Sequence, residues 1–260
     1  MNNILKSDFY RLFRSKAFYI CTAVAVLFMS LNIFILYWAS KTVEGEMSNY
    51  YIMPKDGITF GLSVFSNGNN LIIIGIFAAI FVAAEFAHGT MKNAVSKGFS
   101  RVLIYGSKLI TIMAATFLMH FVNFIIGTLI CTVLTGNLGS FTGEFVANMF
   151  KIMGIELLLN FALAALFVFI GMVIRNLGGV IAINVIGVLS VEPLIYTLLE
   201  LLFDHKVQIS NYSLLNNIAR FIPSTTAAGS DYLRAVIVAA AYLVISAGIG
   251  IFAFRKSDVK

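Results

Sequence analysis

Six long apolar runs, almost free of charged residues, constrain the fold of this chain more than any other feature of its sequence. Each is long enough to cross a bilayer as a helix, which takes about 20 residues. Charged residues make up only 12% of the 260, whereas soluble domains carry about 25%. The sequence therefore predicts one all-α transmembrane domain. Its spans are expected near residues 17–39, 67–85, 105–134, 150–174, 179–203 and 233–254.

The N-terminal segment, residues 1–16, has a pattern of its own. Its apolar residues recur at helical spacing, with cations on the other faces, which predicts an amphipathic helix in the plane of the headgroups. A charged stop before the first span is the alternative interpretation. The run at 17–39 is too long for a signal peptide, whose apolar region has about 7 to 15 residues. The apolar positions are Ile4, Leu5, Phe9, Leu12 and Phe13.

The distribution of Lys and Arg sets the expected orientation, because these residues gather on the cytoplasmic side of membrane proteins. Twelve of them fall in segments that share a side with the N-terminus, and six in the segments opposite. Both termini are therefore predicted to be cytoplasmic. The net charge of +6 does not indicate a nucleic-acid partner, because the cations flank apolar runs and form no continuous basic face. They favour contact with anionic membrane lipids instead.

A polar, basic stretch, AEFAHGTMKNAVSKGFSR, separates the second and third spans at residues 84–101. Gly89 and Thr90 predict the start and N-cap of a short helix, and Gly98 predicts its left-handed end. Ser100 can then cap the following helix. The topology puts this helix, within residues 87–101, on the cytoplasmic side. A charged loop that merely anchors two spans would have the same composition.

The residues of this stretch carry a resemblance. It resembles the inner-loop signature of type-2 ATP-binding-cassette (ABC) transporter permeases, particularly six-span subunits of bacterial peptide-antibiotic exporters. The residues concerned are Glu85, Gly89, Thr90, Lys92, Ser96, Lys97, Gly98, Ser100, Arg101 and Lys108. The resemblance implies a multi-pass protein of the bacterial plasma membrane. It also implies a dimer, with a second copy or a paralogue, that pairs with two cytoplasmic ATPase subunits.

The resemblance further implies that the short helix is a coupling helix, seated in a groove of the ATPase. Met91, Ala94 and Val95 would then make apolar contacts with the ATPase, and Lys92, Lys97 and Arg101 would meet acidic residues or lipid headgroups. The cargo implied is an amphipathic or hydrophobic substrate, first of all an antimicrobial peptide. The residues assigned to coupling are Glu85, Gly89, Thr90, Met91, Lys92, Val95, Lys97, Gly98, Ser100 and Arg101.

Hydrolysis of ATP is not expected on this chain. It lacks the phosphate-binding pattern GxxxxGK[ST], and it also lacks the HExxH and GxSxG motifs of hydrolases. ATP and Mg²⁺ are therefore expected on a separate ATPase subunit, with no cofactor on this chain. Cys21 and Cys131 both lie in apolar runs, so neither a disulfide framework nor a metal site is expected.

Ionisable residues within spans are costly and are candidates for function. The substrate path is expected to involve His120, Glu156, Glu192 and Pro193. Two have a structural alternative: His120 as a packing residue, and Glu156 paired with Lys151. Pro193, which follows Glu192, predicts a hinge or the start of an outer half-helix. The two glutamates would suit a cationic cargo. The insert at 204–231 is apolar enough to re-enter the outer leaflet partly.

Other functions remain open on the sequence. A membrane scaffold or immunity protein would bind a ligand without pumping it, and the same architecture would also serve lipid or drug export. An ion-driven carrier is disfavoured, because no internal repeat and no continuous relay of titratable residues appears.

Overall fold

The computed structural model describes residues 2–42, 56–87, 89–139, 142–203, 208–220 and 229–257. Every regular element in these residues is a helix. Six helical segments are long and apolar enough to cross a membrane, and a shorter helix precedes them. The predicted all-α, six-span fold is therefore confirmed. The six segments are α2 (Lys16–Thr42), α4 (Gly68–Ala87), α6 (Arg101–Thr135), α7 (Gly143–Ile174), a composite fifth segment (Leu177–Leu202) and α11 (Gly229–Lys256).

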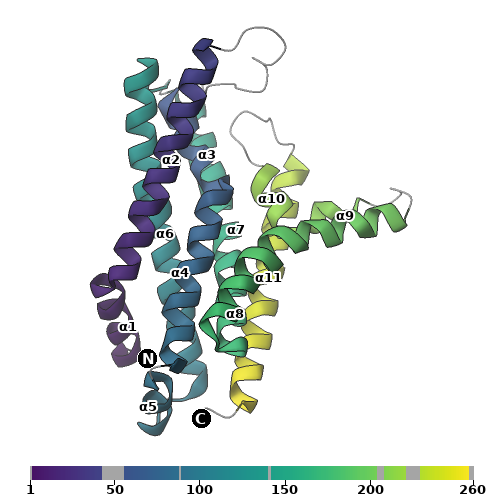
Figure 1. Ribbon diagram of the computed structural model, residues 1–260. Coiled ribbons are helices and arrows are strands. Elements are labelled where there is room, and N and C mark those ends of the chain that lie inside the picture. The colour runs from purple at the N-terminus through teal and green to yellow at the C-terminus, as the bar shows by residue number, and fades with distance from the viewer. Residues whose placement is uncertain are drawn as a thin grey trace.

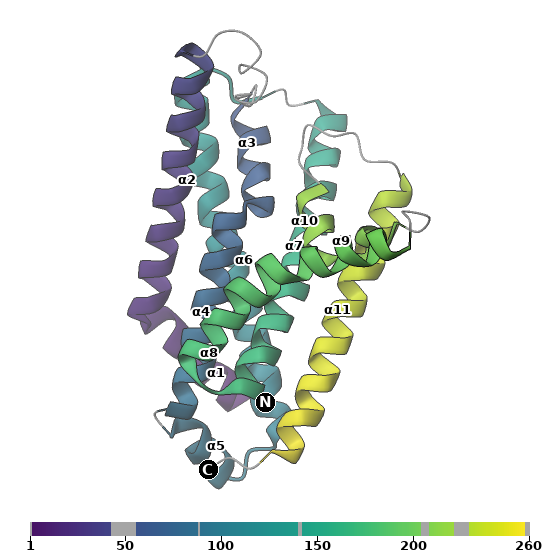
Figure 2. The same ribbon diagram turned by 45° about the vertical axis from the view of Figure 1, so that its right-hand side comes forward.

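The two described chain ends lie at the same end of this bundle (Figures 1 and 2). The first helix, α1 (Asn2–Arg14), and the short helix α5 (Thr90–Ser96) lie there too. This is called the α5 end below. Two other short helices, α3 (Gly57–Ser63) and α10 (Leu214–Arg220), lie in the opposite half.

Helix α1 is amphipathic, and a break at Ser15 separates it from α2. The carbonyl and hydroxyl oxygens of Ser15 both accept from the backbone N–H of Phe18, at 3.1 and 3.4 Å. Leu12 is fully buried against the bundle, whereas Tyr10 and Phe13 are 62% and 50% exposed. One face of α1 therefore packs on the spanning helices, and its aromatic face is free to contact lipid.

Helices α4 and α7 form the centre of the bundle. In the most apolar stretch of α4, 67% of the residues are buried, and in that of α7, 61% are buried. The corresponding share in α2 is 17%. In α2 the buried residues form a single stripe at helical spacing, so the rest of its surface is available to lipid. These stripe residues are Phe18, Cys21, Ala25, Met29 and Ile33.

The fifth segment is not a straight rod. It begins as α8 (Leu177–Ala182), continues as a π-helical stretch, η3 (Ile183–Val191), and ends as α9 (Glu192–Leu202). Figures 1 and 2 show α9 turning away from the bundle axis and running sideways. Pro193 lies in the first turn of α9, where its missing N–H is tolerated. This agrees with the predicted start of a half-helix at Pro193.

Short helical segments fill the half of the bundle opposite α5. Helix α3 and the 3-10 turn η2 (Val64–Ser66) pack against α6. Helix α4 then begins at Gly68, one residue after the start predicted for the second span. Helix α10, preceded by the 3-10 turn η4 (Ile209–Tyr212), packs against α7 and α11 with Leu214 and Ile218 buried. This part of the predicted insert therefore folds back onto the spanning helices. Residues 204–207 and 221–228 of the insert lie outside the described residues.

Close packing of α3 on α6 gives a testable consequence at Gly57. A Cβ added there would collide with the Thr132 hydroxyl and would lie 2.6 Å from the Thr128 carbonyl oxygen. Gly57→Ala is therefore expected to lower the stability by about 1 to 3 kcal/mol through overpacking. Gly68→Ala is the matched control, because Gly68 also begins a helix but has open space around its Cβ position. Thermal unfolding in detergent should separate the two variants; equal midpoints would contradict the packing.

Candidate functional site

Helix α5 is held by a glycine at each end. Gly89 and Gly98 both take the left-handed conformation, at φ 68° and 82°, which glycine adopts without strain. The predicted start at Gly89 and the predicted left-handed end at Gly98 are confirmed, although Thr90 is the first helical residue rather than the N-cap. The Thr90 hydroxyl donates to the Glu85 carbonyl oxygen at 3.1 Å. Ser100 caps α6 as predicted, accepting from the Leu103 N–H at 3.3 Å. Position 88 lies outside the described residues.

The apolar face of α5 packs on the protein's own core. Met91 is fully buried there, and Ala94 and Val95 pack against the same cluster. The Met91 side chain is therefore already covered in this conformation, and its expected apolar contact with an ATPase stays a prediction that would require α5 to shift. The exposed face of α5 instead carries Lys92, Asn93, Ser96 and Lys97.

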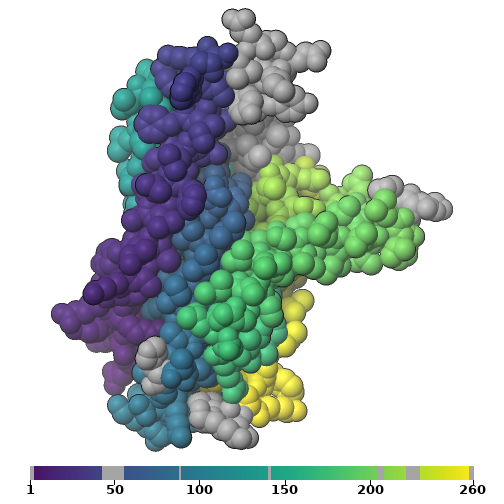
Figure 3. Space-filling view, in the orientation of Figure 1, coloured from purple at the N-terminus to yellow at the C-terminus, as the bar shows by residue number. Residues whose placement is uncertain are grey.

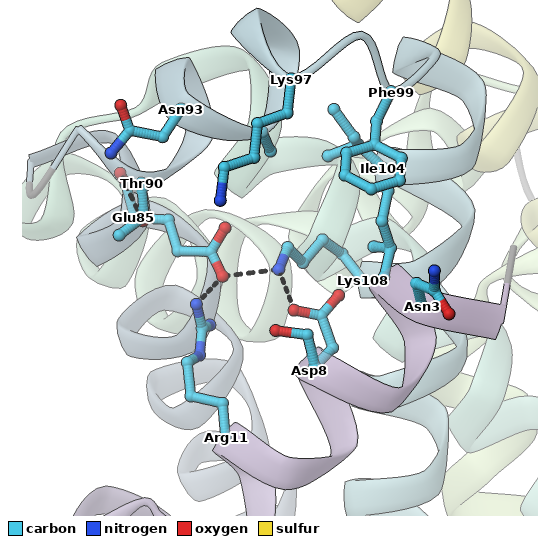
Figure 4. A pocket seen from close by; sticks show the side chains of 13 residues that line it. Asn3, Asp8, Arg11, Glu85, Thr90, Asn93, Lys97, Phe99, Ile104 and Lys108 are labelled. Atoms are coloured by element: carbon cyan, nitrogen blue, oxygen red, sulfur yellow. Dashed lines mark hydrogen bonds and ion pairs between the residues drawn. The ribbon is translucent and has the colours of Figure 1, made fainter.

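A cluster of four charged side chains, the charge cluster, lies directly beneath α5 (Figure 4). Lys108 of α6 lies between two carboxylates: its Nζ is 2.5 Å from Glu85 Oε1 of α4 and also contacts Asp8 Oδ1 of α1. Arg11 of α1 pairs with the same oxygen of Glu85. Asp8, Glu85 and Lys108 are buried. The cluster therefore joins three helices at one point.

Further hydrogen bonds fix the members of the charge cluster. The Ser107 hydroxyl donates to Asp8 Oδ2 at 2.5 Å, and Arg11 Nη2 donates to the Phe81 carbonyl oxygen at 2.5 Å. The Arg11 guanidinium also lies over the Phe81 ring, 3.9 Å from its centre. Burial lowers the pKa of Arg11, and the nearby Asp8 carboxylate opposes that shift. With two cations and two anions the cluster is neutral, which a buried set of charges requires.

A cavity of about 370 Å³ separates the charge cluster from α5. It is lined by all four charged residues and by Thr90, Asn93 and Lys97 from the short helix. Figure 4 shows the Lys97 side chain extending from α5 toward Glu85 and Lys108. The recorded link between α5 and the charge cluster is therefore the Thr90 hydroxyl, which donates to the backbone carbonyl oxygen of Glu85.

Arg101, at the start of α6, holds the end of the last helix. Its Nη1 donates to the carbonyl oxygens of Phe254 and Arg255, both at 2.9 Å, and also contacts the Ser257 carbonyl oxygen. Helix C-termini present unsatisfied carbonyl groups that attract such cations. In this structure Arg101 Nη1 therefore binds carbonyl oxygens at the end of α11, and its expected contact with an acidic residue or a lipid headgroup stays a prediction.

The sequence reasoning missed three of the four members of the charge cluster as site residues. It identified Glu85 and placed Lys108 only in the resembling motif. Arg11 was counted only among the cations of the amphipathic N-terminal helix, which also served to predict the orientation. Asp8 carries the signal that was overlooked, because it lies one helical turn before the buried Leu12 and so shares its face. An acidic residue on the buried face of a basic helix indicates a cationic partner within the protein.

Glu156 of α7 is fully buried within its span. Its Oε1 accepts from the Ser66 hydroxyl at 2.7 Å, and Asn160 of the next turn donates to the Phe65 carbonyl oxygen at 3.2 Å. The pairing with Lys151 predicted as an alternative does not form: the Lys151 ammonium lies over the Tyr232 ring, 3.7 Å from its centre. Glu156 is thus turned toward η2 in the interior.

Glu192 ties the bend of the fifth segment to α10. Its Oε2 accepts from the Ser213 hydroxyl at 2.9 Å, and its Oε1 accepts from the Leu214 N–H and the Tyr242 hydroxyl, both at 3.2 Å. This carboxylate therefore caps the start of α10 and links it to α11. It fixes the corner at which α9 leaves the bundle.

Between α4, η3 and α10 lies a second cavity, of about 360 Å³, called the central cavity below. Of the four residues predicted for a substrate path, Pro193 alone is among the residues that line this cavity. Glu156 accepts from its wall residue Ser66, and Glu192 accepts from the Leu214 N–H at the start of α10, but neither carboxylate lines the cavity. His120 does not line it. Its ring stacks on Phe65, with centres 5.0 Å apart, and its Nδ1 lies 2.9 Å from the Thr116 carbonyl oxygen. This geometry agrees with its alternative interpretation as a packing residue.

Comparison with known proteins identifies a family. The model of a family described as "ABC-2 family transporter protein" matches residues 4–191, nearly three quarters of the chain. This range takes in α1, the charge cluster, α5 and Glu156. A search of curated proteins finds no match.

Proposed function

Because the chain belongs to the ABC-2 family of transporter membrane proteins, we propose that it is the permease subunit of an ATP-driven exporter. Permeases of this family normally work with an ATPase on a separate cytoplasmic subunit. Two copies of that ATPase would pair with two permease chains, and the α5 end would face the cytoplasm. ATP and Mg²⁺ would bind to the ATPase, since this chain lacks a phosphate-binding loop.

The observation that carries this proposal is the connection of α5 to the spanning helices. The Thr90 hydroxyl donates to the backbone carbonyl oxygen of Glu85. The Glu85 carboxylate pairs with Arg11 of α1 and Lys108 of α6. Arg101 then links the start of α6 to the end of α11. A push on α5 by an ATPase would thus reach three spanning helices as well as α1. Packed elements joined in this way move as rigid bodies, which suits the alternating access expected of an exporter.

The central cavity supports an amphipathic or hydrophobic cargo. Most of its lining side chains are apolar, and a few polar groups come from Ser66, Ser190 and Asn216. Sites for small ligands have this composition, with volumes of about 300 to 1,000 Å³. A peptide such as an antimicrobial peptide would place one or two of its residues there. The rest would be held between two copies of the chain.

The test is purification of the chain from gently solubilised bacterial membranes, followed by transport in proteoliposomes. We expect an ATPase with a phosphate-binding loop to co-purify, and labelled amphipathic peptide to move when ATP is added. Vanadate should stop the movement, and dissipation of ion gradients should not. If no such ATPase is bound and peptide is retained without movement, the chain is a scaffold or immunity protein. Transport that collapses with the ion gradient would identify a carrier.

A further inference from the structure

Glu156 lacks the counter-charge that a carboxylate in such a place requires. It is fully buried, and among the described residues no ion pair joins it to a basic side chain. Its Oε1 accepts one hydroxyl hydrogen bond, from Ser66, and its Oε2 has no hydrogen-bond partner in the same part of the chain. A buried carboxylate without a cation is costly inside a membrane. Without a ligand the protonated, neutral form of such a carboxyl group is favoured, and a cation brought close to it would favour the charged form instead.

Ser66 connects this carboxylate to the central cavity. Ser66 is half-buried, and its side chain lies between the lumen of the cavity and Glu156. A hydroxyl has one hydrogen to donate and two lone pairs that accept. While the Ser66 hydrogen is donated to Glu156, its oxygen remains free to accept from a group in the cavity. The carboxylate strengthens that acceptor, because hydrogen bonds in a chain polarise one another.

Other walls of the cavity supply the surface for an apolar group. Leu71 and Ile72 of α4, Val185 and Leu189 of η3, and Leu215 and Ile218 of α10 line it. Figure 3 shows α4, the fifth segment and α10 meeting on one face of the molecule. His120 stacks on Phe65 and forms no ion pair with Glu156 among the described residues.

We propose that the central cavity is a recognition site for a primary amine, in which the protonated amine of an apolar cargo donates to Ser66 and is neutralised by Glu156 behind it. This rests on the proposed function and names the chemical group that the exporter selects. Glu156 acts through Ser66, so it is a positioning residue for the cargo.

Binding is measured on the intact chain in lipid nanodiscs, without ATP. The probes are a fluorescently labelled apolar peptide with one free lysine amine, and the same peptide with that amine acetylated. We expect the free amine to bind about tenfold more tightly, because a hydrogen bond supported by charge is worth about that factor. Glu156→Gln and Ser66→Ala should each remove most of this preference, and their combination should remove little more.

Two variants in the same cavity complete the test. Ser190→Ala removes a second lining hydroxyl that forms no bond with a carboxylate, and it should keep the preference. Gly68→Leu adds volume where a Cβ meets nothing within 4 Å, so it should weaken both peptides. The preference is a ratio within each variant, so partial loss of folded protein cancels.

A preference that persists in both Glu156→Gln and Ser66→Ala would overturn the proposal, as would unchanged binding in Gly68→Leu. Neither result would affect the role of the chain in an ATP-driven exporter. That role is tested separately by the ATPase and by transport.

Discussion

Lys108→Met is expected to destabilise the protein by about 3 to 5 kcal/mol, the cost of removing one partner from a buried set of charges. Lys108 contacts both Asp8 and Glu85, so the variant leaves two buried carboxylates with Arg11 as their remaining cation in the cluster. Methionine keeps the length and the apolar stem of the side chain. The fraction of protein that stays folded and monodisperse in detergent after heating measures the effect.

Lys97→Met is the control for this experiment. Lys97 lines the same cavity and carries the same charge, but it is exposed and joins no ion pair in the described part of the chain. Its replacement should change stability by less than about 1 kcal/mol. Adding Asp8→Asn to Lys108→Met restores the balance of charge and should recover part of the loss. If Lys108→Met and Lys97→Met unfold at the same temperature, the charge cluster does not hold the three helices together.

The six spans are predictable from the sequence because their signal is local. A long apolar run fixes a crossing by itself, and residues such as Gly68, Gly98 and Ser100 mark helix ends through the conformation of one or two residues. The same reasoning reached the fifth segment only in part. Pro193 indicates a bend, but the sideways course of α9 depends on the bonds of Glu192 to Ser213 and Leu214, some twenty residues further along the chain.

The charge cluster could not be predicted from the sequence, because its members come from distant parts of the chain. Asp8 and Lys108 are 100 residues apart, and their pairing depends on how α1 docks on α6. Met91 illustrates another ambiguity: an apolar residue on a short helix can face its own core or a partner, and helical spacing is the same in both cases. The intramembrane carboxylates Glu156 and Glu192 were identified only because a charged side chain inside a membrane is energetically costly. Their hydrogen bonds to Ser66 of η2 and to Leu214 of α10 depend on how these short helices pack, which no local pattern reveals.

Asn93→Pro is expected to abolish ATP-driven transport while leaving the spanning helices folded. The Asn93 N–H donates to the Gly89 carbonyl oxygen at 3.1 Å and closes the first turn of α5. Proline removes this donor and its ring clashes with that carbonyl, at a cost of about 3 kcal/mol. A helix of seven residues has too few other bonds to withstand it. Transport in proteoliposomes and co-purification of the ATPase are the two measurements.

Asn93→Ala tests whether transport depends on the helical conformation of α5 or on the Asn93 side chain. It removes the same exposed amide group but keeps the backbone N–H, and alanine favours the helix more than asparagine does. We expect this variant to transport as the wild type does. If both variants fail, the Asn93 side chain itself contacts the ATPase. If both transport normally, α5 does not have to be helical to transmit the movement of the ATPase. The proposed coupling through Glu85, Lys108 and Arg101 would then be contradicted.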